Sequence, residues 1–398
     1  MPDALHTVLI TGVGLVSSLG EGVEAHVSRL RDRATPQPRI EADRFAPYLV
    51  HPLPEIDWSR QIAKKGDQRQ METWQKIGVY TAGLALDDAA IPVDESVRSG
   101  IDMIVAAGGG ERDPSVDALV MARARGVDDP RPLINELLSS ELRPTLFLAQ
   151  LSNLMAGNIS IVHKVTGSSR TFMGEEGAGV SAVQVAAARV RAGQSRICLV
   201  GGAFSAERKD LLLNYELAGL LPRNGWQPVS ERRGDAGGIV PGSMGAFLVL
   251  ESADSARERG ATAYGVVRFV AGDRGRPDAM SERLGAMVEA SGVDGDDALV
   301  LSGATGLADD MLRETQALFP RLGSAPVRAV ANLVGHGFEA QFPASIALGA
   351  ICLAHGILPA PAGGGEERPA SFAPRSVVVT SHGHRRGEGV CVLESTAA

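Results

Sequence analysis

Apolar runs that end in glycine recur along the chain, and alanine-rich segments lie between them. Their continuous hydrophobicity is typical of strands that are buried on both faces. The runs are TVLITGVG at 7–14, DMIVAAGGG at 102–110, ICLVGGA at 197–203, ALVLSGATG at 298–306 and SVVVTSHG at 376–383. Residues 78–90 and 179–193 have helical periodicity instead. The alternation predicts an α/β fold built in layers.

The order of these elements occurs twice. A second round opens with AYGVVRFVAG at 263–272, which parallels the first apolar run. In each round a glycine-containing loop leads into an alanine-rich helix, at 174–190 and again at 335–356. We therefore expect a duplicated architecture with an N-terminal half at 1–250 and a C-terminal half at 251–398.

Two segments outside this pattern are rich in polar residues, proline or glycine. Residues 29–76 carry many charged residues and are expected to form surface excursions. The sequence PAPAGGGEERPASFAP at 359–374 predicts a flexible loop before the last strands.

Composition and charge exclude several classes of function. The chain has 398 residues, of which 44% are hydrophobic, so it can bury a large core. A net charge of −8 opposes binding to nucleic acid or to anionic lipid. We find neither 18 consecutive apolar residues nor a basic stretch followed by an apolar one near residue 1, so no membrane segment is expected and the protein is placed in the cytoplasm.

The cysteines and the glycine motifs do not predict a cofactor. Cys198, Cys352 and Cys391 lie inside apolar runs without a CxxC pair, which favours buried side chains over a metal site or a disulfide. A dinucleotide-binding loop fails because Ser17 stands where its third glycine belongs. A hydrolase GxSxG motif fails because Pro241 precedes Ser243 by two residues. We expect no cofactor and no metal.

Four segments carry a resemblance to a known family. VLITGVGLVSSLG, LSNLMAGNISIVHKVTGSSRTF, GGIVPGSMGAFLVLES and NLVGHG resemble the β-ketoacyl-acyl-carrier-protein synthases, or ketosynthases, and the likeness extends over nearly the whole chain. This resemblance implies a thiolase-like, duplicated α-β-α-β-α layered fold.

The resemblance also implies which residues would carry the chemistry. A ketosynthase needs a thiolate, two histidines and donors for an oxyanion. Counting back from RAGQSRICLVGGA places the nucleophile position on Glu176, and a carboxylate cannot form the required thioester. Gly303 takes the place of the first histidine, and His336 remains as the second, although the lysine five residues before it is Ala331. In the C-terminal loop His384 stands at the phenylalanine position. These departures indicate a site that no longer condenses.

Glu176 admits two interpretations, and a third alternative concerns the function of the whole chain. A carboxylate at a helix N-terminus interacts favourably with the helix dipole, by roughly 0.3–1 kcal/mol, so its role can be structural. Relatives that carry glutamine at this position decarboxylate malonyl groups, which leaves open a malonyl-carrier decarboxylase. A stand-alone acyl-binding protein is the third. A shift of the alignment by one residue would exchange Glu175 and Glu176 without restoring a nucleophile.

Ketosynthases resembling this chain are dimers whose strand before the nucleophile, here SSRTFMGE, pairs across the two-fold axis. The resemblance therefore implies a chain-length factor of polyketide or polyene biosynthesis, a subunit that is inactive alone and forms a heterodimer with an active ketosynthase. The acyl carrier protein would meet the complex through that partner. Residues predicted to line the acyl cavity are Phe147, Leu151, Leu154, Phe172 and Met173.

Overall fold

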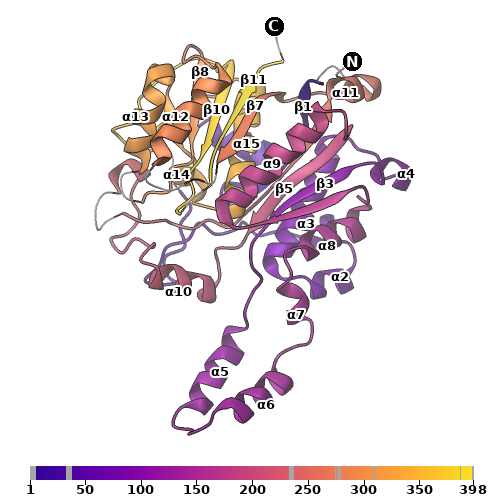
Figure 1. The fold of residues 1–398 in the computed structure, drawn as a ribbon, viewed down its shortest axis with the longest axis vertical. Coiled ribbons are helices and arrows are strands. Elements are labelled where there is room, and N and C mark those ends of the chain that lie inside the picture. The colour runs from indigo at the N-terminus through magenta and orange to yellow at the C-terminus, as the bar shows by residue number, and fades with distance from the viewer. Residues whose placement is uncertain are drawn as a thin grey trace.

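Within the part of the chain that the structure describes, one mixed sheet of 11 strands runs through the molecule (Figure 1). The computed structural model describes residues 6–32, 38–232, 237–273, 275, 279–307, 310–385 and 387–396, without the side chain of Phe147. The strands are β1 (Val8–Ser17), β2 (Gly20–Glu21), β3 (Asp102–Ala107), β4 (Ser169–Met173), β5 (Ile197–Phe204), β6 (Met244–Ser252), β7 (Gly265–Asp273), β8 (Ala298–Ser302), β9 (Val327–Ala329), β10 (Ser376–Ser381) and β11 (Glu388–Glu394).

The strand order has an internal symmetry. It reads β4-β3-β5-β6-β1 and then β7-β11-β10-β8-β9, so the second half repeats the first in reverse across the antiparallel pair β1 and β7. In both halves the two outermost pairings are parallel and the inner pairings are antiparallel. The predicted duplicated α/β fold is confirmed. The division at residue 250, which lies inside β6, stays a prediction.

Two helices lie between the halves, and others cover their outer faces. The inner helices α9 (Glu175–Arg191) and α15 (Gln341–His355) each pack on strands of both halves. In the first half α3 (Thr73–Asp88) covers β1, β5 and β6, and in the second half α12 (Met280–Ser291) covers β7 and β11. The remaining α-helices are α1 (Gly22–Leu30), α2 (Lys65–Gln70), α4 (Glu95–Arg98), α5 (Pro114–Ala124), α6 (Arg131–Glu141), α7 (Leu146–Ala149), α8 (Leu154–His163), α10 (Lys209–Leu217), α11 (Ala253–Arg259), α13 (Asp310–Leu322) and α14 (Val330–Val334).

The glycines of β1 allow close packing of a strand on a helix. A Cβ on Gly12 would collide with the Ala85 carbonyl oxygen of α3, and one on Gly14 would collide with the Thr81 carbonyl oxygen. These glycines therefore serve the contact between β1 and α3, in agreement with the rejection of a dinucleotide loop.

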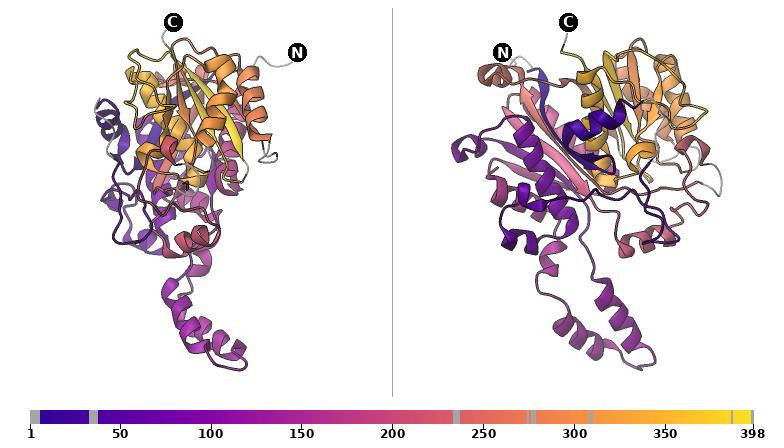
Figure 2. Two further views of the ribbon diagram at one scale, coloured as in Figure 1. Left: turned by 90° about the vertical axis from the view of Figure 1, so that its left-hand side faces the viewer. Right: turned by 180° about the vertical axis from the view of Figure 1, so that it is seen from behind.

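Helices α5 and α6 form a hairpin that projects away from the sheet (Figures 1 and 2). The hairpin begins after the glycines that follow β3, and the chain returns to the body at α7. We call residues 111–143 the arm.

The three cysteines are free and buried, as predicted. Burial raises the pKa of Cys198, Cys352 and Cys391 to about 12, so none of them is activated as a thiolate. Within the described ranges, every helix is too short or too polar to cross a membrane.

Candidate functional site

Glu176 occupies the second position of helix α9, deep inside the protein. The residue before the helix, Gly174, has φ 114°, and Glu175 has φ 44°, so the chain makes a sharp turn as it leaves β4. The turn directs the side chain of Glu176 inward, where it is 1% exposed. This carboxylate lies where the sequence comparison places the nucleophile.

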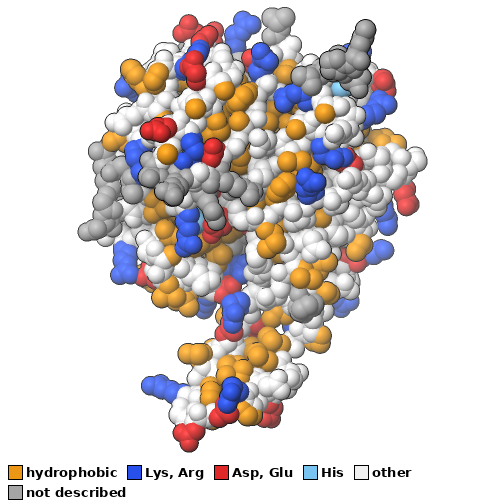
Figure 3. Space-filling model, viewed as in Figure 1, with side chains coloured by type: hydrophobic (Ala, Val, Ile, Leu, Met, Phe, Trp, Pro, Cys, Tyr) orange, Lys and Arg blue, Asp and Glu red, His pale blue; other side chains and the backbone are white. Residues whose placement is uncertain are grey.

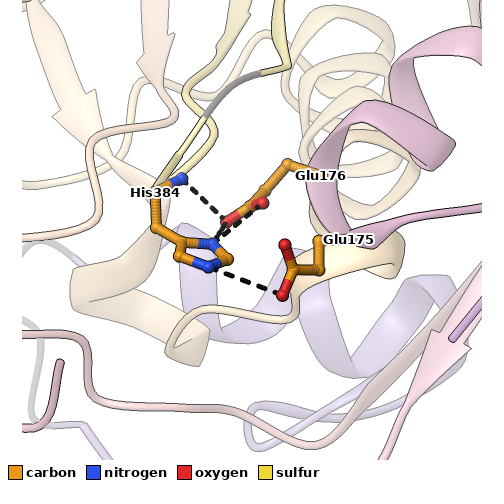
Figure 4. A group of neighbouring side chains, drawn as sticks. All are labelled: Glu175, Glu176 and His384. Atoms are coloured by element: carbon orange, nitrogen blue, oxygen red, sulfur yellow. Dashed lines mark hydrogen bonds and ion pairs between the residues drawn. The ribbon is translucent and has the colours of Figure 1, made fainter. Parts of the chain in front are cut away.

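Two imidazoles contact that carboxylate. His336, in the loop after α14, has its Nε2 atom 2.8 Å from Glu176 Oε1. His384, in the turn after β10, donates its backbone N–H to the same oxygen at 3.3 Å, and its ring Nδ1 lies 3.1 Å away (Figure 4). The structure thus brings together Glu176, His336 and His384, and we call these three residues the ion cluster.

Burial and the neighbouring charges shift the pKa values of Glu176 and His384 in opposite directions. Burial alone would raise the pKa of Glu176, but hydrogen bonds and charge from His336 and His384 outweigh burial and lower it to about 2. Burial would lower the pKa of His384, but the carboxylates of Glu176 and Glu175 outweigh that effect and raise it. The favoured state therefore has Glu176 ionised and His384 protonated.

Glu175 faces the other ring nitrogen of His384 and is partly exposed (Figure 4). Its side chain is 47% exposed, and its Oε1 atom lies 3.5 Å from His384 Nε2. Partial burial raises its pKa, and the charge of His384 opposes that rise. Of the two adjacent glutamates, Glu176 is therefore the one fixed inside the site.

The ion cluster and Glu175 also have the composition of a metal site. Ligand atoms of Glu175, Glu176 and His384 lie within 4.8 Å of one another. However, the two ring nitrogens of His384 each face a carboxylate oxygen, Nδ1 toward Glu176 and Nε2 toward Glu175 (Figure 4). A ring that bridges two carboxylates in this way acts as a hydrogen-bond donor on both sides, and it offers no lone pair to a metal.

Gly303 follows strand β8 at a place where backbone leaves no room for a side chain. Its N–H donates to Thr380 Oγ1 at 2.9 Å, and a Cβ would lie 2.6 Å from the Thr380 carbonyl oxygen. The nearby volume is filled by Glu314, which accepts hydrogen bonds from the Ser302 and Thr380 hydroxyls and pairs with His382 at 3.0 Å. Other polar contacts therefore occupy the position that aligns with the first histidine of the family.

Restoring that histidine should therefore damage the fold. We expect Gly303→His to lower the free energy of unfolding by about 3 kcal/mol or more, because the new side chain meets fixed backbone. Urea unfolding would measure the loss. Gly66→His is the matched control, since nothing lies within 4 Å of a Cβ at Gly66. Equal stability of the two variants would contradict the steric account.

A cavity of about 540 Å³ opens beside the ion cluster. All of its lining residues except Glu339 belong to the N-terminal half of the chain. The lining residues are Trp74, Gly108, Gly109, Gly110, Arg112, Gln150, Met173, Gly174, Glu175, Phe204, Ser205, Arg208, Asp210, Leu211, Asn214, Tyr215 and Glu339. Burial raises the pKa of Glu339 to about 8, and the charges of Glu176 and Glu175 add to that rise. Glu176, His336 and His384 are not among the lining residues.

Five residues are predicted to line an acyl cavity, and one of them, Met173, lines this cavity in the single chain. Phe172 packs against the main core, Leu151 is 38% exposed, and Leu154 is partly buried at the start of α8. The side chain of Phe147 lies outside what the structure describes. Sequence reasoning missed Tyr215 and Glu339. The only available signal was the glycine run after β3, which marks the cavity rim.

Comparison with known proteins identifies the family. Residues 6–256 match the model of the beta-ketoacyl synthase N-terminal domain. This chain belongs to the beta-ketoacyl synthase family. The solved structure of the ishigamide ketosynthase/chain length factor superposes with a TM-score of 0.81 at 22% identity, covering 99% of this chain and 100% of that chain. The thiolase-like fold predicted from sequence is thereby confirmed.

Curated relatives match along most of the chain. The granaticin polyketide putative beta-ketoacyl synthase 2 of Streptomyces violaceoruber is 30% identical over 90% of this chain and 86% of that protein. The tetracenomycin polyketide synthase ketoacyl synthase beta subunit of Streptomyces glaucescens is 26% identical over 91% and 89%. A 3-oxoacyl-[acyl-carrier-protein] synthase 2 of Vibrio harveyi is 25% identical over 65% of this chain and 60% of that protein.

Proposed function

We propose that this protein is the non-condensing subunit, or chain-length factor, of a heterodimeric ketosynthase in polyketide or polyene biosynthesis. The partner subunit supplies the cysteine and both histidines, and this subunit supplies part of the cavity into which the acyl chain grows. The complex works in the cytoplasm and receives its substrate from an acyl carrier protein that docks on the partner.

The state of the ion cluster supports a subunit without its own condensing activity. Glu176 carries a carboxylate in place of the thiolate that would take up the acyl chain. The side chains of His336 and His384 are each 1% exposed. A substrate in the neighbouring cavity would contact Glu175 rather than these three groups, which do not line it. The burial of both imidazoles also argues against the decarboxylase alternative, because a malonyl carboxylate would have to reach side chains that are 1% exposed.

The end of the sheet offers a surface for the partner. Strand β4 is the last strand of the described sheet and pairs on one side with β3, so its other edge is available for pairing. Met173, at the end of β4, is 61% exposed. The arm carries further exposed apolar side chains, Met121, Val127 and Leu138. Figure 3 shows hydrophobic side chains on the projecting hairpin. An apolar surface of this kind favours a stable protein contact.

One observation carries the proposal. The rim of the cavity is formed by the segments that border this surface, namely the glycines Gly108–Gly110 at the base of the arm, Gln150, and Met173 on β4. A partner seated on β4 and the arm would therefore cover the cavity and share it. A subunit that contributes cavity wall across an interface can limit chain growth by its shape.

Co-expression with each candidate ketosynthase tests the proposal. We expect a one-to-one complex by native mass, with condensation activity that neither protein has alone. The activity should disappear when the partner's cysteine is replaced, and it should persist in Glu176→Ala. A homodimer that releases carbon dioxide from malonyl-carrier, and stops doing so in Glu176→Ala, would instead establish the decarboxylase.

A further inference from the structure

We infer that an aromatic stack of Phe204, Phe338 and Tyr215 forms the closed end of the cavity and is the element of this chain that limits acyl length. The inference rests on the proposed function for its effect on products. It assigns the role to residues other than the five predicted from the sequence, of which Met173 lines the same cavity.

Two rings of the stack line the cavity, and the third lies next to the ion cluster. Tyr215 of α10 and Phe204 at the end of β5 both line the cavity. Behind them lies Phe338, which is fully buried and does not line the cavity. Its ring centroid is 4.5 Å from that of Tyr215 with an interplanar angle of 6°, and 4.9 Å from that of Phe204.

Phe338 also contacts the imidazoles of the ion cluster. Its ring meets His336 edge-on at 4.8 Å and His384 edge-on at 5.6 Å. Tyr215 itself lies edge-on to His384 at 6.4 Å, so the stack borders the histidines through both Tyr215 and Phe338. The rings therefore cover the histidines on the side of the cavity that Tyr215 and Phe204 line, and Glu175 borders both the cavity and His384 beside them.

The backbone of Phe338 is consistent with a specialised position. It has φ 45°, a conformation that bulky residues seldom adopt, at the start of the short helix that follows His336. Strained backbone at such a site persists only where surrounding contacts hold it. Here four neighbouring rings, those of Tyr215, Phe204, His336 and His384, contact Phe338, so the stack is a fixed wall rather than a loosely packed side chain.

Removing a ring should open the wall toward the histidines, and chemical labelling measures this without any partner. In the wild-type protein, diethyl pyrocarbonate should label His336 and His384 far more slowly than His6, whose side chain is 37% exposed. Tyr215→Ala and Phe338→Gly should each raise labelling of both histidines several-fold. Glycine relieves the positive φ of Phe338, so the second variant guards against a folding failure of the first.

The matched control is Leu217→Ala, on the same helix as Tyr215, where the side chain is 77% exposed. It should leave the labelling of His336 and His384 as slow as in the wild type. Folded Tyr215→Ala and Phe338→Gly proteins whose histidines remain as protected as in this control would overturn the wall.

The effect on products is tested in the complex with the active ketosynthase. Tyr215→Ala and Phe204→Ala should shift the main product to a chain longer by at least one extension unit, and Tyr215→Phe, which keeps the ring, should restore the wild-type length. Unchanged lengths in an active complex would overturn the inference. Failure of the wild-type pair to assemble or condense would overturn the proposed function, and the labelling result would still decide whether the wall exists.

Discussion

Met173→Glu should weaken the binding of the protein to its ketosynthase while leaving the fold intact. Met173 ends strand β4, is 61% exposed and lies on the cavity rim. In the proposed complex a carboxylate at this position would lose its hydration without gaining a partner. We expect affinity to fall by about 2 kcal/mol or more, which is roughly 30-fold in Kd. Biolayer interferometry against the immobilised ketosynthase would measure the change.

The chain offers a closely matched control. Phe319 of α13 is 63% exposed and lies at the opposite end of the sheet, beside β8 and β9. Phe319→Glu therefore adds the same charge to an equally exposed apolar residue away from the proposed interface. Binding should remain at the wild-type level. Equal losses in both variants would mean that net charge, and not contact at β4, determines the affinity.

The predicted strands are confirmed, because the local pattern of apolar residues was enough to determine them. All five apolar runs that end in glycine form strands, β1, β3, β5, β8 and β10, and the segment opening the second round forms β7. Strands buried on both faces need continuous apolar sequence, so their signal does not depend on distant residues. The symmetric pairing of β1 with β7 then follows from the duplicated order of elements.

Other segments were harder because long-range contacts decide them. Residues 29–76 were expected at the surface, yet Val50, Ile62 and Trp74 are buried. The loop 359–374 was expected to be flexible, but the buried guanidinium of Arg328 donates to the carbonyl oxygens of Pro359 and Arg368 and holds the loop across its base. Neither the burial of these three residues nor the hydrogen bonds of Arg328 leave a periodic signal in the sequence.

The candidate site likewise has residues that local sequence predicts and residues that only long-range contacts bring together. Counting along an ungapped motif was enough to place Glu176 at the start of its helix, and the structure puts it against His336. The second imidazole on Glu176 comes from His384, which the sequence suggested only as a loop substitution. The cavity could not be predicted, because its walls come from residues as distant in sequence as Trp74 and Glu339.

Replacing Glu176 by glutamine should destabilise the protein in a way that depends on pH. The variant keeps the shape of the side chain but removes the buried charge that His384 and His336 surround. Breaking a buried ion pair by removing one partner costs about 3 kcal/mol or more. Condensation by the complex with the ketosynthase should be unaffected, because Glu176 takes no part in the proposed chemistry.

The sign of the pH dependence follows from the two pKa shifts. The pKa of Glu176 is lowered from 4.5 to about 2, so its stabilisation is present above pH 4.5 and is lost as the pH falls toward 2. The pKa of His384 is raised above 6.5, so its stabilisation is present below pH 6.5 and is lost as the pH rises through the folded value. The difference in unfolding free energy between wild type and Glu176→Gln should therefore be largest between pH 4.5 and 6.5 and should shrink at alkaline pH.

Urea unfolding of both proteins at a mildly acidic and an alkaline pH would measure that difference. Glu289→Gln is the control, because Glu289 forms a surface pair with Arg321 in which its side chain is 65% exposed, and screening by solvent makes such pairs weak. That variant should stay close to the wild type at both pH values. A difference for Glu176→Gln that is the same at both pH values would mean that hydrogen-bond geometry, and not the charge shared with His384, holds the start of α9 in place.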